Sequence, residues 1–193
     1  MSSRYRPIAF EVERTMHPRA SALGVADYVI RHAAPGQHVL DLGCGSGIVG
    51  GTILLHRPDL RVSFADKYEY ALEETVQNLR RNGLEAHQVR LADMAQPQSG
   101  FDTIDLLVSN PPFQENAPDD PVRFFAPQES MGVPAGAPWW FFYDQILTHY
   151  NAGLFIFHTG RRCSGRLHAL ARGHGKRVKV KEKTVHHLLP ANS

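Results

Sequence analysis

The clearest candidate for chemistry in this chain of 193 residues is a run of closely spaced glycines in VLDLGCGSGIVG. Glycine accepts positive φ angles and lets a ligand approach the backbone closely. The run lies between a strand pattern and a helix pattern, and a helix N-terminus presents unpaired N–H groups to an anion. Gly45, Gly47 and Gly50 satisfy G-x-G-x-x-G, a dinucleotide-binding fingerprint. The segment therefore predicts a ligand-binding loop.

An aspartate ends the next strand pattern. Asp66 stands 19 residues after Gly47, at the end of RVSFAD. A carboxylate in this place can accept hydrogen bonds from both hydroxyls of a ribose. It could also serve as the N-cap of a helix over KYEYALEE, because aspartate is a favoured N-cap residue. The two roles are compatible, and we expect Asp66 to bind a ribose.

The glycine segment can also be parsed with an aspartate at its head. Asp41, Gly43, Gly45 and Gly47 satisfy D-x-G-x-G-x-G, which resembles the first motif of class I S-adenosylmethionine (AdoMet)-dependent methyltransferases. The resemblance implies that these four residues and Asp66 bind AdoMet. Asp93 follows the third strand pattern, in LADM, where such enzymes often hold the adenine amino group. The resemblance therefore adds Asp93 to the cofactor site.

A second motif follows the fourth strand pattern. Asn110-Pro111-Pro112-Phe113 resembles the N/D-P-P-Y/F motif of amino-methyltransferases, which methylate planar NH₂ groups. The segments FDTIDLLVSNPPF and PWWFFYDQIL are similar to segments of the HemK/PrmC group, which methylates a glutamine side chain in peptide release factors. That group usually has Tyr where Phe113 stands. The resemblance covers about residues 20–190, with both motifs in the expected order.

The resemblance implies catalytic roles for Asn110, Pro111 and Phe113, and it also places Asn110 among the cofactor-binding residues. A planar NH₂ is a poor nucleophile because its lone pair is delocalised. The side-chain oxygen of Asn110 and the carbonyl of Pro111 would accept its hydrogens, aim the nitrogen at the methyl group and stabilise the developing charge. Phe113 would stack on the target, and the adjacent prolines restrain the loop. The alternative is a strand-end turn without a ligand.

Alternating strand and helix patterns position both motifs. Strands separated by helices imply parallel pairing through right-handed crossovers, with a cleft at the carboxyl ends of the strands. We expect an α/β, doubly wound, Rossmann-like fold with a seven-stranded, mostly parallel sheet and a C-terminal antiparallel β pair. The patterns predict helices over 20–31, 48–57, 67–82, 139–150 and 164–172, and strands over 38–42, 61–65, 88–91, 103–109 and 154–158.

The predicted organisation is one domain over 20–193 after an N-terminal arm over 1–19. The span 112–138 is too long for a routine connection, so we interpret it as a substrate loop. Trp139–Tyr143 are five adjacent aromatic residues. Because a helix cannot bury all of them on one face, we expect one or two to face a ligand. Alternatively, Trp140 and Tyr143 belong to the core.

Composition excludes several classes of protein. The chain is 42% hydrophobic and 21% charged, and it has only two cysteines, which argues against a disulfide scaffold and favours the cytoplasm. Its N-terminus lacks the apolar core of a signal peptide, and no apolar run approaches the length of a membrane span. The 11 histidines include no H-E-x-x-H pattern, so we predict no metal and no membrane partner.

The basic residues are concentrated at the end of the chain. Residues 161–193 carry nine Lys and Arg against a single Glu. A basic region can attract nucleic acid. It is equally consistent with an exposed edge strand, since Lys179, Lys181 and Lys183 alternate with other residues and lysines block edge-to-edge pairing.

These observations lead to a main functional hypothesis with alternatives. The first is an AdoMet-dependent N-methyltransferase, acting as a monomer or small homo-oligomer. Its substrate would be a protein glutamine side chain, followed by an adenine or guanine amino group in RNA or DNA, and then a small molecule. An NAD-binding oxidoreductase would use the same glycine loop, but it leaves Asn110–Phe113 unexplained. A non-catalytic subunit that activates a partner is the third class.

Overall fold

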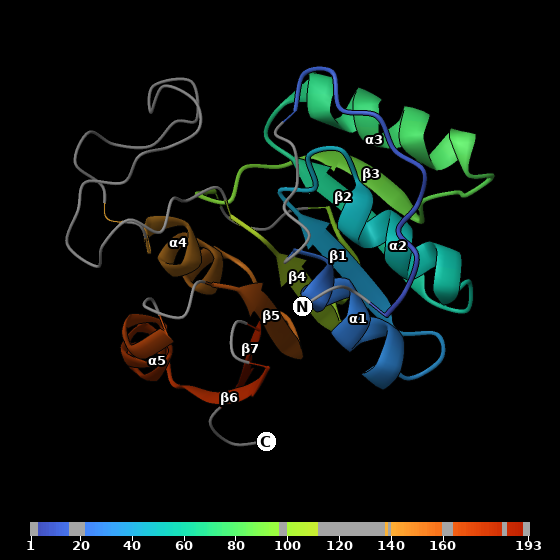
Figure 1. Cartoon of the computed structure of the whole chain (residues 1–193). Helices are drawn as coiled ribbons and strands as arrows, with labels where there is room; N and C mark the ends of the chain where they lie inside the picture. The colour runs from blue at the N-terminus through green and yellow to red at the C-terminus, as the bar shows by residue number, and fades with distance from the viewer. Residues whose placement is uncertain are drawn as a thin grey trace.

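In the computed structural model, the chain forms a sheet with helices packed on its faces (Figure 1). The structure describes residues 4–15, 22–96, 100–111, 138, 140–159, 164–182 and 185–190. The helices in this part of the chain are α1 (Leu23–His32), α2 (Ile48–His56), α3 (Glu69–Arg81), α4 (Phe141–His149) and α5 (Ser164–Gly173). The strands are β1 (His38–Leu42), β2 (Arg61–Asp66), β3 (Gln88–Leu91), β4 (Leu106–Ser109), β5 (Leu154–His158), β6 (Lys176–Glu182) and β7 (Val185–Pro190).

The sheet has the strand order β3-β2-β1-β4-β5-β7-β6. The first five strands in this order pair in parallel, whereas β7 pairs antiparallel with both β5 and β6. The predicted α/β, Rossmann-like fold is confirmed. The chain leaves β1 toward β2 and β3, then crosses back to β4 and β5. This reversal creates a switch point at the carboxyl ends of β1 and β4, where open α/β sheets bind ligands.

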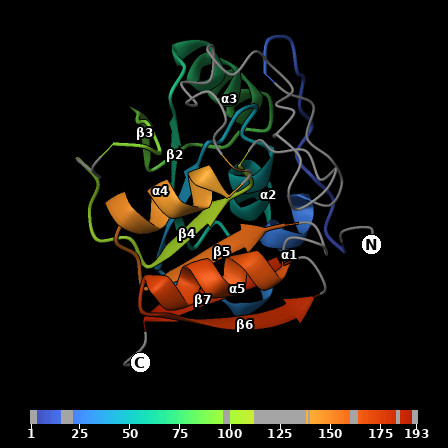
Figure 2. The same cartoon turned by 90° about the vertical axis from the view of Figure 1, so that its left-hand side faces the viewer.

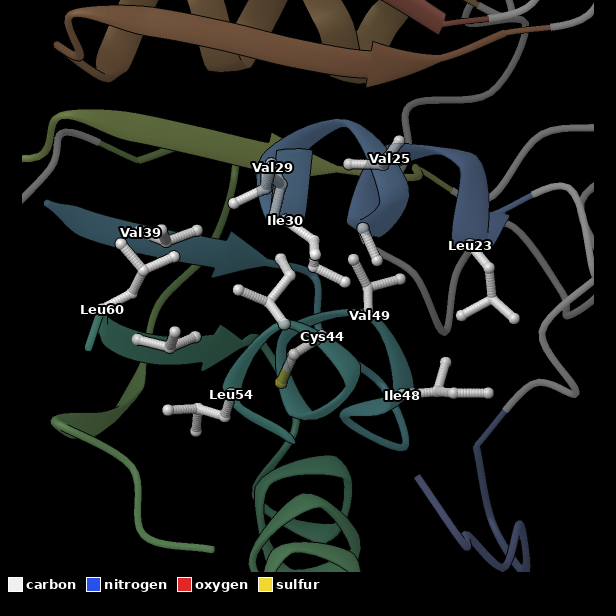
Figure 3. Packing of buried hydrophobic residues seen from close by; sticks show 14 of the residues in the cluster. Leu23, Val25, Val29, Ile30, Val39, Cys44, Ile48, Val49, Leu54 and Leu60 are labelled. Carbon is white, nitrogen blue, oxygen red and sulfur yellow. The ribbon is translucent and has the colours of Figure 1, made fainter. Parts of the chain in front are cut away.

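Strands β1, β2, β4 and β5 are largely buried on both faces, as expected of parallel strands covered by helices, whereas β3 at the edge is half-buried to exposed. Side chains of a strand alternate between the faces, and they divide here between two hydrophobic clusters. Val39, Val108 and Ile156 pack with α1 and α2 in the cluster drawn in Figure 3. Leu40 and Phe157, like other residues of the same strands, pack with α4 and α5 on the opposite face. The parallel strands therefore form a covered layer that exposes its ends.

Some boundaries differ from those predicted. The strand predicted over 103–109 begins only at Leu106. Before it, the backbone N–H of His38 donates to the carboxylate of Asp105 at 2.7 Å. A side chain therefore takes the place of the backbone carbonyl that would accept this N–H between paired strands. β6 is an outer strand of the sheet, which agrees with the edge-strand interpretation of the C-terminal lysines, although their side chains lie outside the described residues.

A buried histidine joins strands at the amino edge of the sheet, opposite the switch point. His38 is fully buried, with Nδ1 3.0 Å from the carbonyl oxygen of Thr103 and Nε2 2.8 Å from the Ser63 hydroxyl. Burial lowers the pKa of His38, and the charges of Arg61 and His87 act in the same direction, against the Thr103 hydrogen bond and Asp102. The folded protein therefore favours the neutral imidazole.

This arrangement predicts an acid-sensitive fold. A histidine with a lowered folded pKa contributes stability that is present above its unfolded pKa of about 6.5 and is lost as the pH falls below that value. The contribution of His38 to the free energy of unfolding, measured with urea, should fall between about pH 7 and pH 5, whereas the raised pKa values of buried Asp41 and Asp66 act in the opposite direction. Because these carboxyls are present in both proteins, the protein should lose stability over this range relative to the His38→Gln variant, which cannot take up that proton. Equal pH slopes for the two proteins would contradict the role given to His38.

Candidate functional site

The loop between β1 and α2 adopts the backbone that its glycines predict. Gly43, Gly45 and Gly47 have φ angles of 74°, 54° and 75°, in the left-handed region that favours glycine. A Cβ atom at Gly43 would lie 2.1 Å from Cε of Met94, and one at Gly47 would lie 2.8 Å from Cγ2 of Thr75. At Gly47, close packing therefore adds to the requirement for glycine that the backbone conformation sets, whereas the flexible end of Met94 could move away from Gly43.

Asp41 is buried at the end of β1 and anchors the start of α2. Its Oδ2 accepts the backbone N–H of Gly50 at 2.8 Å. Gly50 is required there because a Cβ atom would lie 2.5 Å from the Phe64 ring. Burial raises the pKa of Asp41 to about 7; the Gly50 hydrogen bond opposes this shift and the charge of Asp66 adds to it. Direct contact between Asp41 and a cofactor stays a prediction.

Asp66 lies at the carboxyl end of β2 and supports the same loop. Its Oδ2 accepts the backbone N–H of Gly45 at 3.0 Å, and its Oδ1 accepts that of Tyr68 at 3.1 Å. Burial raises the Asp66 pKa against the effect of these hydrogen bonds. The N-cap residue of α3 is Tyr68, so the expectation that Asp66 itself caps this helix is wrong. Each carboxylate oxygen retains lone-pair capacity, which suits a ribose hydroxyl.

Asp93 follows β3, as expected, but it already has partners. Lys67 Nζ lies 3.0 Å from Asp93 Oδ2, and the backbone N–H of Ala95 donates to Oδ1 at 2.9 Å. The Tyr150 hydroxyl donates to the Asp93 backbone carbonyl at 3.1 Å. The ion pair is partly exposed, and such pairs contribute little stability. An adenine amino group would therefore have to share or displace Lys67, and this role of Asp93 stays a prediction.

The second motif begins beside the glycine loop. Ser109, the last residue of β4, is buried and donates from its hydroxyl to the backbone carbonyl of Leu42 at 2.7 Å. Because β1 and β4 pair in parallel, Gly43 and Asn110 leave neighbouring strand ends. Asn110 is half-buried and Pro111 is buried. Pro112 and Phe113 lie outside the described residues, as does the predicted substrate loop except Pro138.

The aromatic run after this loop divides between core and edge. Phe142 and Tyr143 are buried in α4, which supports a core role for Tyr143. Trp140 is only half-buried at the start of the helix. Trp139 lies outside the described residues. Phe141 is also half-buried, so Trp140 and Phe141 are the described candidates for the ligand-facing aromatic expected from the sequence.

The N-terminal arm is a contributor that the sequence-based site did not include. Figure 1 shows its blue segment running along α3 and α2. Glu74 of α3 is buried and accepts hydrogen bonds from the backbone N–H groups of Glu13, Arg14 and Thr15, and from the Thr15 hydroxyl. Burial acts to raise the pKa of Glu74, but these hydrogen bonds outweigh it and hold the pKa below its ordinary value.

The arm reaches the glycine loop through α3. A Cβ atom at Gly45 would lie 3.9 Å from Cβ of Thr15. The Thr75 hydroxyl donates to the Gly45 carbonyl at 2.8 Å, and Asn78 Nδ2 donates to the Ser46 carbonyl at 2.9 Å. A signal for this network was present in the sequence. Polar residues recur at spacings of four along α3, at Glu74, Asn78 and Asn82, and all three bind the arm backbone.

The described residues contain neither a candidate metal site nor a helix that could span a membrane. No group of three or more His, Cys, Asp or Glu side chains among them could hold a metal ion. None of the helices described is both long and apolar enough to cross a membrane.

Comparison with known proteins identifies the family. Residues 27–125, just over half of the chain, match the methyltransferase small domain. The chain belongs to the methyltransferase small domain family. The geometry of the glycine loop suits either AdoMet or NAD. Membership of this family indicates that the cofactor is AdoMet.

The sequence relatives are ribosomal RNA methyltransferases. The chain is 35% identical to the ribosomal RNA large subunit methyltransferase G of Colwellia psychrerythraea over 43% of its own length and 22% of the relative's. It is 37% identical to the ribosomal RNA small subunit methyltransferase C of Ectopseudomonas mendocina over 42% of its length and 24% of the relative's. The matches therefore span less than a quarter of these curated relatives.

The fold comparison extends over nearly the whole chain. The crystal structure of a ribosomal protein L11 methylase from Lactobacillus delbrueckii superposes with a TM-score of 0.63 at 15% identity, covering 96% of this chain and 89% of that one. At this identity the likeness supports the fold alone. These comparisons do not confirm the similarity to the HemK/PrmC group that the sequence suggested.

The position of Asp66 predicts a large effect on cofactor affinity. Asp66→Ala should weaken AdoMet binding by roughly 1–3 kcal/mol, because it would remove the charge-assisted hydrogen bonds expected with the ribose and would release the backbone N–H of Gly45. Isothermal titration calorimetry would measure the change. Asp59→Ala is the matched control, since Asp59 lies before the amino end of β2 and pairs with Arg57. Equal affinities for the Asp66 variant and the unaltered protein would remove Asp66 from the cofactor site.

The contacts of the N-terminal arm predict that Glu74 protects the peptide bond after Arg14 from cleavage by trypsin. Glu74→Ala should lower the free energy of local opening by about 1–3 kcal/mol, because several N–H groups lose their acceptor. Limited trypsin digestion, followed by mass spectrometry, should then cleave after Arg14 about tenfold faster or more. Exposed Glu73, which pairs with Arg14 at the surface, provides a milder comparison as Glu73→Ala. No acceleration in the Glu74 variant would show that other contacts hold the arm.

Proposed function

We propose that this chain is an AdoMet-dependent N-methyltransferase that acts on an amino group of a nucleobase in RNA. The observation that carries the proposal is that the glycine loop after β1 and Asn110 after β4 leave neighbouring strand ends, which the Ser109–Leu42 hydrogen bond joins. This arrangement puts a cofactor loop and a candidate NH₂-binding motif at one edge of the sheet.

The sequence relatives favour RNA over the protein glutamine side chain that was the first expectation. Both relatives described above are named for methylation of ribosomal RNA. Because the chain matches less than a quarter of their length, the substrate is our inference for this chain and not a property carried over. The basic C-terminal region is consistent with a polyanionic substrate.

The residues at the loop fit AdoMet in their chemistry. Asp66 provides carboxylate oxygens for ribose hydroxyls, and the start of α2 provides backbone N–H groups beside tightly packed glycines. Asp93 follows β3, where the family resemblance expects adenine, and it pairs with Lys67, which follows β2. When bound, AdoMet supplies an electrophilic methyl group on a positively charged sulfur.

The chain's own task is then to orient the target nitrogen. Asn110 Oδ1 and the Pro111 carbonyl accept the two NH₂ hydrogens, which turns the nitrogen lone pair toward the methyl group. Fixed acceptors also stabilise the positive charge that develops on nitrogen during transfer. A strong general base is unnecessary, because the proton can leave after the methyl group has moved. Phe113 would stack on the base and limit its rotation.

Asn110→Ala should abolish most methylation and leave AdoMet affinity nearly unchanged. Loss of a preorganised hydrogen-bond partner at a reacting centre typically lowers the rate by about 10²–10³-fold. Asn110→Asp keeps an acceptor at this position and should retain partial activity. Single-turnover transfer of labelled methyl groups to deproteinised ribosomal RNA, combined with calorimetry of AdoMet, would measure both quantities.

The same assay separates the substrate classes. Incubation of the unaltered chain with labelled AdoMet and fractionated cell extract should place the label in RNA. Label found only in protein would favour the glutamine alternative, and label only in small molecules would favour a metabolite. Asn151→Ala, near the amino end of β5, is the control for Asn110→Ala. Normal turnover in Asn110→Ala would mean that the motif is only a turn after β4 and that Asn110 does not hold the target NH₂.

A further inference from the structure

The start of α4 is fixed at the carboxyl edge of the sheet, beside Asn110. The Tyr143 hydroxyl donates to the backbone carbonyl of His158 at 2.7 Å. His158 is the last residue of β5, and β5 pairs in parallel with β4 so that Phe157 lies opposite Ser109. Asn110 therefore leaves β4 at the level of His158. The hydrogen bond holds the first turn of α4 next to the methyl-transfer motif.

Trp140 and Arg166 meet at this edge. Trp140 precedes Tyr143 by three residues, so it lies on the same side of the helix and farther toward the edge. It packs against the hydrophobic cluster on this face of the sheet. The Arg166 guanidinium carbon lies 5.4 Å from the centroid of the Trp140 ring. Figure 2 shows α4 and α5 beginning on the side to which β4 and β5 point.

The charge of Arg166 is available to a ligand. Arg14, Arg57 and Arg81 each pair with a carboxylate at 2.6 to 2.7 Å. Arg166 is exposed and forms no ion pair with any carboxylate in the part of the chain that the structure describes. A guanidinium stacked on an indole keeps its charge and its N–H edge, which matches the oxygens of a phosphate. The stacking also restricts the orientation of a long side chain before binding.

We propose that Trp140 and Arg166 form a phosphate-binding pair that holds the RNA backbone next to the nucleotide being methylated. The inference rests on the proposed function, because it requires RNA as the substrate. Trp140 is a positioning residue for the guanidinium, and Arg166 donates hydrogen bonds to a phosphate oxygen. Since neither side chain contacts the transferred methyl group in this arrangement, the pair governs substrate capture. Its loss should raise KM for RNA and leave kcat and AdoMet affinity nearly unchanged.

The test compares arginines at opposite ends of one helix. Arg166 lies in the first turn of α5 and Arg172 in its last turn, and both are exposed. Methylation of deproteinised ribosomal RNA would be measured for Arg166→Gln and Arg172→Gln over a range of KCl concentrations. Arg166→Gln should raise KM about tenfold, as expected for one charge-assisted hydrogen bond. The slope of log KM against log salt concentration should decrease by about 0.7–0.9, the value of one phosphate contact. Arg172→Gln should change neither quantity.

Three further variants test the stacking. Arg166→Lys keeps the charge but loses the planar fork, and should give an intermediate KM. Trp140→Leu should raise KM for RNA although Arg166 is intact. Trp140→Phe keeps an aromatic ring under the guanidinium, so its KM should stay near that of the unaltered protein. AdoMet calorimetry on each variant reports whether the fold and cofactor site are intact.

The outcomes distinguish this inference from the function on which it rests. If the unaltered chain methylates RNA and Arg166→Gln matches it in KM and salt slope, the phosphate-binding pair is wrong and the proposed function stands. If Arg166→Gln and Arg172→Gln are equally impaired, the effect is general electrostatic attraction and the pair is again wrong. If the unaltered chain labels protein and no RNA, the proposed function and the inference both fail.

Discussion

Two buried aspartates at neighbouring strand ends hold the backbone of a single glycine loop, and the rest of the site depends on this arrangement. Asp41 accepts the N–H of Gly50 at 2.8 Å, and Asp66 accepts that of Gly45 at 3.0 Å. Buried carboxylates are costly unless they are hydrogen-bonded, so the fold gains stability only when the loop presents those N–H groups to them. The position of α2 and the backbone of the glycine loop follow from this constraint.

The parallel sheet then brings the second motif to the same place. Because β1 and β4 are adjacent and parallel, residues that leave their carboxyl ends emerge side by side although they are far apart in the sequence. The Ser109–Leu42 hydrogen bond joins these ends at 2.7 Å. The Tyr143–His158 hydrogen bond extends the same edge to α4. One edge of the sheet thus carries the residues proposed for cofactor, target base and phosphate.

Helix α3 connects this edge with the N-terminal arm. Its buried Glu74 holds the arm backbone, while Thr75 and Asn78 hold the carbonyls of Gly45 and Ser46. Side chains of adjacent turns therefore contact the arm and the cofactor loop at once.

Much of the fold and cofactor loop could be predicted from local patterns. Apolar strand runs alternating with helices indicate a covered parallel sheet, and closely spaced glycines indicate a loop with positive φ, because both features depend on neighbours within a few residues. The motif at Asn110 indicated its chemistry by resemblance, and the structure describes it only as far as Pro111.

Only the tertiary structure decided which distant residues share a surface. The docking of the arm on Glu74, the Lys67–Asp93 ion pair and the stacking of Arg166 on Trp140 join residues from separate turns, loops or helices. The sequence contains the side chains of these contacts but not their distances. Those distances depend on how helices pack on the sheet, and that packing minimises exposed apolar surface over the whole fold rather than within any short segment.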